Sequence, residues 1–240
     1  MKALTFIAIT LFSGALAGVV LAIVNQGIVE PYIERAIAIE NQRASAQGEM
    51  INPVEFQAYR VWQKGGSVAA GAVLGMSYGA LFGLVFAYGR NSLPGSTNLK
   101  KALVLAAIMW FTLYVVVELK YPANPPAVGD PATIGLRQSL WVAMISISGL
   151  SALGLAVARR WMKGAARIAA PVTVYAAIVI AAFAALPANP DAVTAPMDLV
   201  TGFRIASGAT MTMFWLVMGA TLGMLWDRTK PHETAKVKAV

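Results

Sequence analysis

The sequence predicts an all-α integral membrane protein with six transmembrane helices and both termini in the cytoplasm. Three observations support this fold class. Of the 240 residues, 58% are hydrophobic and only 12% are charged, whereas a soluble domain carries about 25% charged residues. Six apolar stretches are separated by polar connections, and the Lys and Arg residues gather in alternate connections.

The six apolar stretches each approach the length at which a helix crosses a bilayer, about 20 residues. Lipid offers backbone polar groups no partners, and the stretches lack strict alternation, so we expect helices and not a barrel. The third stretch is the shortest and is extended by Leu119. The predicted spans cover residues 3–24, 66–88, 102–119, 140–158, 168–186 and 205–226. Together they predict a single transmembrane domain over residues 1–226, followed by a polar cytoplasmic tail over 227–240.

The first stretch follows Lys2, as the core of a secretory signal would, but it is longer than the roughly 7–15 apolar residues of such a core. We therefore expect it to be retained as a span. A long outer loop, residues 25–65, comes next. Within it, residues 32–42 follow Pro31 and alternate charged with apolar side chains, which predicts a short amphipathic helix along the outer surface.

The distribution of basic residues predicts the orientation, because Lys and Arg are disfavoured in translocated loops while acidic residues count little. One side of the predicted bundle holds 12 of the 19 bases and two acids, Asp227 and Glu233. The other side holds seven bases and nine acids. The basic side, which includes Lys2, Arg159 and Lys236, is therefore predicted to face the cytoplasm. This places the chain as a multi-pass protein of the cytoplasmic (inner) membrane.

An internal repeat appears at the outer ends of the third and fifth spans. Residues 122–125 and 187–190 both read Pro-Ala-Asn-Pro, and each copy is followed by Ala-Val and a later proline. Gly-Leu-Arg at 135–137 then corresponds to Gly-Phe-Arg at 202–204, at the entrance to the next span. The second span joins this pattern more loosely. We therefore predict three repeated helical hairpins in parallel orientation, related about an axis near the membrane normal.

Glycines spaced four residues apart recur within the predicted spans. Such spacing lets two helices approach closely and is typical of packing seams, although glycines in a permeation path remain an alternative. The pairs are Gly14 with Gly18, Gly71 with Gly75, Gly79 with Gly83, and Gly219 with Gly223.

Several function classes find no support in the sequence. There is no cysteine, and the single histidine, His232, lies in the polar tail, so neither a thiolate metal site nor a Ser-His-Asp set can be assembled. No phosphate-binding loop is present, and the bases do not form a basic domain of the kind that binds nucleic acid. We expect no catalytic residues, no cofactor and no nucleic-acid partner.

Charges near the outer membrane boundary are the candidates for function, because a charge in hydrocarbon is costly unless it is paired or faces water. In one interpretation, Glu118, Asp130 and the amide oxygens of Asn124 and Asn189 form an oxygen-lined vestibule that attracts a divalent cation. In the other, Arg137 and Arg204 reach from their helix starts to pair with the acids, while the Pro-Ala-Asn-Pro words only end helices and shape turns. The residues alone leave both interpretations open.

Residues 120–138, Lys-Tyr-Pro-Ala-Asn-Pro-Pro-Ala-Val-Gly-Asp-Pro-Ala-Thr-Ile-Gly-Leu-Arg-Gln, resemble a signature of the CbtA family of predicted cobalt transporter subunits. Looser similarity extends to both ends of the chain, in residues 14–18 and 29–34 and in residues 203–207 and 214–219. The resemblance thus touches most of the chain, and its central motif is specific.

The resemblance implies a membrane subunit for uptake of cobalt, or of another divalent cation, that works with a small single-span CbtB-like partner carrying a histidine-rich segment. Many members of that family carry histidines in the first outer loop, whereas residues 25–65 of this chain contain none. Metal capture would then fall to a partner, or to Glu118 and Asp130. The alternative is a non-transporting structural subunit that packs within a larger membrane complex.

Overall fold

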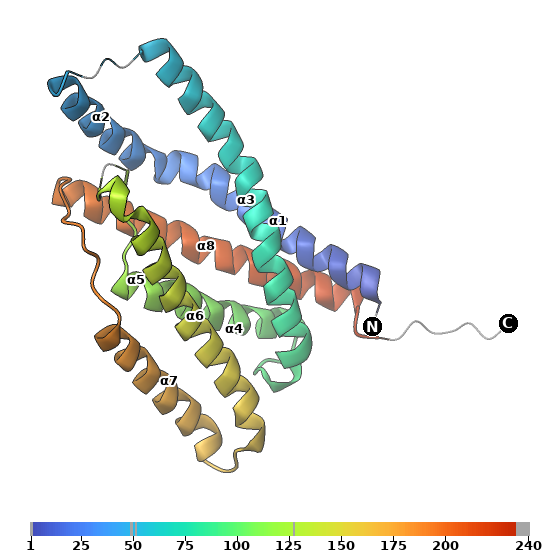
Figure 1. Cartoon of the computed structure of the whole chain (residues 1–240). Helices are drawn as coiled ribbons and strands as arrows, with labels where there is room; N and C mark the ends of the chain where they lie inside the picture. The colour runs from blue at the N-terminus through green and yellow to red at the C-terminus, as the bar shows by residue number, and fades with distance from the viewer. Residues whose placement is uncertain (1, 49, 51, 127, 234–240) are drawn as a thin grey trace. The chain divides into compact units, whose positions relative to one another are not determined.

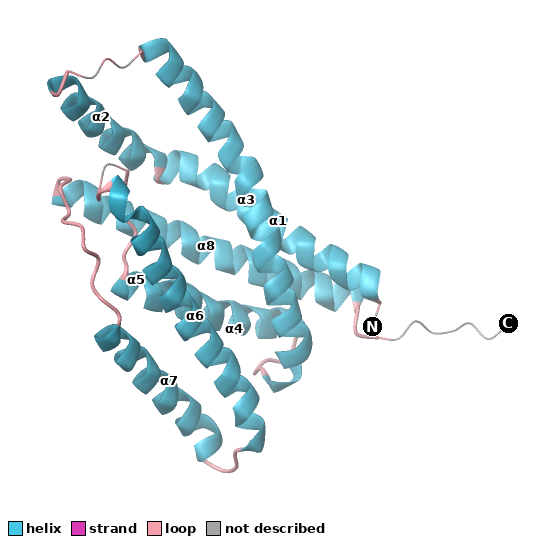
Figure 2. Ribbon diagram, viewed as in Figure 1, coloured by secondary structure: helices cyan, strands magenta, loops and turns pink. Residues whose placement is uncertain are grey.

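The computed structural model describes residues 2–48, 50, 52–126 and 128–233, and all regular structure in these ranges is helical (Figure 2). Six helical segments in the described part are long and apolar enough to cross a membrane: Ala3–Ile28, Pro53–Ser92, Asn98–Lys120, Pro131–Trp161, Ala166–Ala185 and Met197–Thr229. They cover the six apolar stretches, except that the fifth helix ends at Ala185, one residue before its stretch, so the predicted all-α membrane fold is confirmed. Part of the predicted tail, residues 234–240, lies outside the described ranges.

The helices follow one another along the chain, and the connection between α7 and α8 is a long loop (Figure 1). The third span is one continuous helix in three parts, with a π-helical segment in its middle. The α-helices are α1 (Ala3–Ile28), α2 (Glu30–Ala46), α3 (Pro53–Gly89), α4 (Asn98–Trp110), α5 (Val116–Lys120), α6 (Ile134–Ala158), α7 (Ala166–Ala185) and α8 (Met197–Thr229). The π-helix is η2 (Phe111–Val115), and the single 3₁₀ turns are η1 (Arg90–Ser92), η3 (Pro131–Thr133) and η4 (Arg159–Trp161).

The segment predicted as an outer loop is a helical hairpin over most of its described length, and α2 is longer than the predicted helix over 32–42. Helix α3 starts well before its apolar run because Pro53 occupies its first turn and the Asn52 side chain caps it, accepting a hydrogen bond from Val54 N at 3.1 Å. The polar turns of the hairpin are joined by ion pairs. Lys64 Nζ lies 2.5 Å from Glu34 Oε1, and Arg60 pairs with Glu30.

The chain forms two compact units, the first of which comprises Met1–Ile108 and Ile205–Val240. In this unit α1 and α3 touch backbone to backbone at their glycines. A Cβ atom added to Gly14 would lie 2.1 Å from the carbonyl oxygen of Gly75, and one added to Gly18 would lie 1.9 Å from that of Gly71. Gly79 faces the backbone of Thr10 and Gly14. Only glycine permits this approach of the two helices.

A second close contact in this unit joins α4 and α8. A Cβ on Gly219 would lie 2.8 Å from the Ala106 Cβ, and one on Gly223 would lie 2.5 Å from Leu99 Cα. Next to it, the Asp227 carboxylate accepts hydrogen bonds from the backbone N–H groups of Asn98 and Leu99, both at 3.1 Å. The end of α8 thereby supplies the cap for the start of α4.

Aromatic side chains fill the rest of this unit's core. The fully buried Trp226 meets Phe6 and Phe86 edge to face, with ring centroids 5.9 and 5.0 Å apart. Its indole N–H donates to His232 Nδ1 at 3.1 Å. His232 is therefore half-buried against Trp226, and the tail at this point is packed, not freely solvated. Beside it, the backbone N–H of Lys2 donates to the Pro231 carbonyl at 2.8 Å, so the ends of α1 and α8 lie together.

The second unit comprises Met109–Arg204. Its core is formed where α5, α6 and α7 meet, around the fully buried Val117 and Met144. The remaining buried members are Val116, Tyr121, Leu140 and Ala182. Most other side chains of α6 and α7 face outward.

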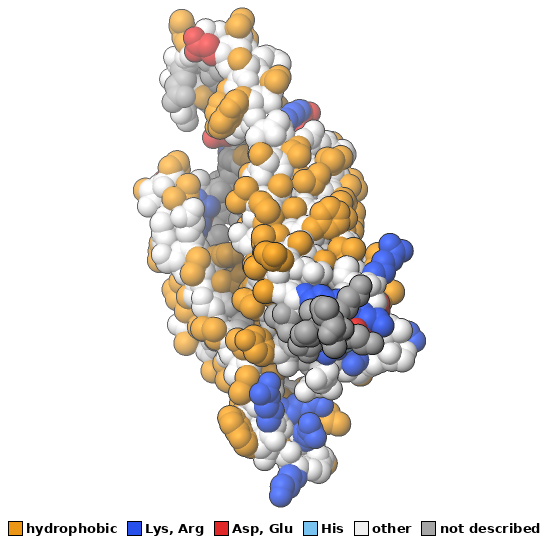
Figure 3. Space-filling model, turned by 90° about the vertical axis from the view of Figure 1, so that its right-hand side faces the viewer, with side chains coloured by type: hydrophobic (Ala, Val, Ile, Leu, Met, Phe, Trp, Pro, Cys, Tyr) orange, Lys and Arg blue, Asp and Glu red, His pale blue; other side chains and the backbone are white. Residues whose placement is uncertain are grey.

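The outward faces of the spans are apolar, as a lipid-facing surface requires. On α7, Ile168, Val172 and Ile180 are 65–70% exposed, and on α1 Leu4 is 84% exposed. Figure 3 shows hydrophobic side chains over much of the visible surface. In water such an apolar surface would promote association with other molecules. In a bilayer it is the surface expected to contact lipid.

The glycine contact between α1 and α3 gives a stability prediction. Gly75→Ala places a methyl group 2.1 Å from the Gly14 carbonyl oxygen, so we expect it to destabilise the protein by about 1–3 kcal/mol or more through overpacking. Thermal unfolding of the detergent-purified chain measures this. Gly66→Ala, on the same helix but with open space around the added carbon, is the matched control and should unfold near the parent temperature. Equal unfolding temperatures for the two variants would contradict the close contact.

Candidate functional site

The polar residues predicted as functional gather in the second unit around two segments, residues 121–133 and 186–196, which we call the proline–asparagine loops. Each loop begins where a helix stops in front of the Pro-Ala-Asn-Pro word. Tyr121 follows α5 and Leu186 follows α7, and both leave the helical conformation. A residue before proline disfavours the α conformation, so the prolines at 122 and 187 end these helices.

The first proline–asparagine loop is held by Arg204 of α8. Arg204 Nε donates to the Ala123 carbonyl at 3.0 Å, and Nη2 donates to Asn124 Oδ1 at 2.7 Å. The Ala123 N–H in turn donates to Glu118 Oε2 at 2.6 Å. The half-buried Glu118 carboxylate, the Asn124 amide and the Arg204 guanidinium are thus brought together around one peptide unit. This set is the first of two polar clusters in the second unit.

Two further bonds connect the end of α5 with the end of α7. Lys120 Nζ donates to the Phe183 carbonyl at 2.8 Å, and the Tyr121 hydroxyl donates to the Pro187 carbonyl at 2.6 Å. Burial raises the pKa of Tyr121 above its usual value, so its hydroxyl stays protonated and able to donate at neutral pH. The two loops are therefore fastened to each other through backbone carbonyls.

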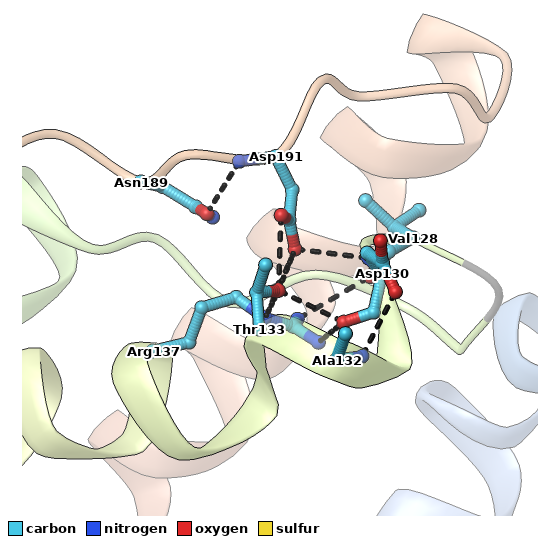
Figure 4. Close-up of polar contacts among 7 residues, drawn as sticks. All are labelled: Val128, Asp130, Ala132, Thr133, Arg137, Asn189 and Asp191. Carbon is cyan, nitrogen blue, oxygen red and sulfur yellow. Dashed lines mark hydrogen bonds and ion pairs between the residues drawn. The ribbon is translucent and has the colours of Figure 1, made fainter.

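The second proline–asparagine loop is held by Arg137 of α6 through Asp191 (Figure 4). Arg137 Nε lies 3.0 Å from Asp191 Oδ2, and the Asp191 side chain is only 7% exposed. The same carboxylate accepts from Thr133 Oγ1 at 2.7 Å and from the Asp130 N–H at 3.0 Å. Asn189 Oδ1 accepts from the Asp191 N–H at 3.1 Å and shapes the turn. Asp191 is thus fixed by several donors at the start of α6, where a negative charge is favoured.

Gly129 makes room for this cluster. Its φ of +103° favours glycine, and a Cβ there would lie 2.5 Å from Asp191 Oδ2 and 2.7 Å from Arg137 Nη1. A side chain at this position would therefore displace the ion pair as well as strain the backbone.

Each of the two arginines holds the loop of the other copy of the internal repeat. Arg137 follows the first Pro-Ala-Asn-Pro word and holds the second loop, while Arg204 follows the second word and holds the first loop. The predicted residues therefore divide into two groups: Glu118 with Asn124 and Arg204, and Asp130 and Asn189 with Arg137. The arrangement of all spans as three repeated hairpins stays a prediction.

Asp191, the centre of the second group, is absent from the residues that the sequence singled out. A signal was present, because Asp191 stands in the second copy at the position that Pro126 occupies in the first. The two sequence motifs are otherwise identical around this position. A charged residue at the position where they differ indicates a role specific to that copy. Thr133, which bonds the same carboxylate, carried no such signal.

The chemistry that these groups allow is limited by the bonds they already make. Asn124, Asn189 and Asp191 have oxygens occupied by protein donors. The Asp130 carboxylate accepts a local bond from Ala132 N at 2.8 Å, and Asp130 is exposed. Among residues 2–48, 50, 52–126 and 128–233, no group of three or more histidine or acidic side chains lies close enough to hold a metal ion. The described residues of the loops therefore form no preformed metal cage, and the Asp130 carboxylate in them is exposed.

Six apolar spans joined by charged loops define a multi-pass α-helical membrane protein. The Pro-Ala-Asn-Pro motifs in its loops point to its family. The chain belongs to the CbtA family, described as "Probable cobalt transporter subunit (CbtA)", whose sequence model matches residues 3–227. The resemblance of residues 120–138 is thereby confirmed, and the chain is a probable cobalt transporter subunit. No curated protein and no solved structure gives a significant match.

The family description also bears on partners and on enzymatic activity. A subunit works with at least one further subunit. The family description is that of a transporter subunit and names no enzymatic activity. The alternative of a non-transporting structural subunit is not favoured by this membership.

The Arg137–Asp191 pair gives a second prediction. Breaking a hydrogen-bonded charge pair with little solvent access costs about 1.5–3 kcal/mol, so Asp191→Asn should lower the unfolding temperature of the purified protein. Arg137→Gln should do the same, and the double variant should lose less than the sum of the two. A double-mutant cycle on thermal unfolding gives the coupling energy, and strictly additive losses would contradict a direct interaction.

Proposed function

We propose that this chain moves cobalt, or a similar small divalent cation, inward across the cytoplasmic membrane, and that Glu118 and Asp130 attract the ion at the outer face. The single observation that supports this function best is the match to a cobalt transporter family over residues 3–227. Six membrane-crossing helices in the described part of the chain agree with it.

The direction of transport rests on the charge distribution. Twelve of the 19 bases belong to connections on one side of the predicted bundle, and Lys and Arg favour the cytoplasmic side. Both termini would then lie in the cytoplasm, and the proline–asparagine loops would face outward. Nine of the 11 acids share that outward side, which favours the approach of a cation from outside.

Capture of the metal would need a partner. Cobalt binds imidazole well, yet the only histidine of this chain is His232, on the predicted cytoplasmic side. A small single-span CbtB-like subunit with a histidine-rich outer segment would supply the missing ligands. Glu118 and Asp130 would then receive an ion that the partner has collected, as hard oxygen ligands that bind weakly enough to release it.

The orientation has a direct test, because the chain contains no cysteine and single cysteines can be introduced as reporters. Lys163→Cys, in the connection between α6 and α7, should resist a membrane-impermeant maleimide in intact cells and react after the membrane is opened. Met50→Cys, at a position 98% exposed between α2 and α3, should react in intact cells. The reverse pattern would overturn the proposed direction.

Transport is tested by measuring cobalt in cells with and without this chain, expressed with its partner. We expect accumulation to depend on the chain and to fall about five- to tenfold in Glu118→Gln, the effect of about 1–1.4 kcal/mol, with a smaller loss in Asp130→Asn. Glu55→Gln, which removes an exposed acid of α3, is the matched control and should transport normally. Unchanged cobalt content after deletion of the whole chain would remove the proposed function.

A further inference from the structure

The π-helix η2 interrupts the third span shortly before Glu118. The N–H of Val116 donates to the carbonyl of Phe111, five residues back, and not to that of Thr112, four residues back. The Thr112 carbonyl is therefore not the acceptor of the Val116 N–H, as it would be in a continuous α-helix. In hydrocarbon a carbonyl must find another partner within the protein.

Ser148 of α6 provides that partner. Its hydroxyl donates to the Thr112 carbonyl at 2.5 Å and lies 2.7 Å from the hydroxyl of Tyr175 of α7. The single hydroxyl hydrogen of Ser148 is used on Thr112, so Tyr175 is the donor in the second bond. Ser148 is fully buried, and these residues lie near the middle of their three spans. A short chain of hydrogen bonds thus connects three helices inside the membrane.

The π-helix decides which way the following residues face. It contains one residue more than α-helical geometry allows, and one residue corresponds to a turn of about 100° about the helix axis. If the Val116 N–H donated to the Thr112 carbonyl instead, the π-helix would shift to another position along the span. The side chains of the residues that follow would then rotate about the helix axis. In the present register Val117 is buried in the core and Leu119 is 70% exposed, and Glu118 accepts the Ala123 N–H.

We infer that Ser148 and Tyr175 are positioning residues for transport: by binding the Thr112 carbonyl they hold the π-helix in place and so keep Glu118 turned toward Ala123 of the first proline–asparagine loop. The inference rests on the proposed role of Glu118 in attracting the cation. It assigns a purpose to the buried Ser148 and the half-buried Tyr175, which lie on α6 and α7 outside the loops.

The register is tested with single cysteines in the purified, otherwise cysteine-free chain. In the parent, Leu119→Cys should react readily with N-ethylmaleimide and Val117→Cys should be protected. In a Ser148→Ala background the reactivity of the cysteine at position 119 relative to that at position 117 should fall several-fold. The reason is that the Thr112 carbonyl would accept the Val116 N–H again, and residues 116–120 would rotate about the helix axis. Tyr175→Phe should give a smaller shift. Ser146→Ala, an exposed serine two residues away on the same helix, should leave the preference unchanged.

The same variants are then measured for cobalt accumulation in cells. Ser148→Ala should transport no better than Glu118→Gln, and Ser146→Ala should match the parent. An unchanged cysteine preference in Ser148→Ala, or normal transport despite a changed preference, would overturn the inference. If Ser148→Ala cannot be purified as a folded protein, Tyr175→Phe decides by the same two measurements. Failure of the proposed function is distinct, because deletion of the whole chain would then leave cobalt content unchanged.

Discussion

The structure depends on one constraint: inside a bilayer each backbone N–H and C=O must be bound by the protein itself. The constraint makes every span a helix, and it explains why the irregular backbone lies in the connections. At η2, where the helical pattern is broken inside a span, a buried serine hydroxyl takes the released carbonyl. At the ends of α5 and α7, where the helices stop, Arg204, Lys120 and Tyr121 donate to main-chain carbonyls.

The six spans could be predicted because apolar length is a strong signal and the connections carry nearly all the charges. The helical hairpin of α2 and α3 could not, because Pro53 and Asn52 start α3 by local capping in a polar stretch, where hydropathy carries no information. The π-helix leaves no periodic trace in the sequence, since the residues at 111–115 are as apolar as their neighbours. The bond that accompanies it comes from a tertiary partner, Ser148, distant along the chain.

The sequence indicated which residues could form the candidate site, but not which of them bind one another. The repeated words indicated Arg137 and Arg204 and placed them at helix starts. That each arginine binds the loop of the other copy follows from how α5 to α8 pack, which no spacing in the sequence reveals. In the structure the arginines fasten the loops, Arg137 through Asp191 and Arg204 through Ala123 and Asn124, while Asp130 is exposed and Glu118 is half-buried.

The hydrogen bond between Lys2 and Pro231 has a consequence for chain connectivity. With the residues outside these two positions removed, a bridge of a few residues between them would convert the open polypeptide into a ring. Cyclisation reduces the conformational freedom of the unfolded chain, so the ring would be harder to unfold. New ends can then be opened at the turn around Gly164, whose φ is +55°. The product is a circularly permuted protein whose chain starts and ends in the connection between α6 and α7.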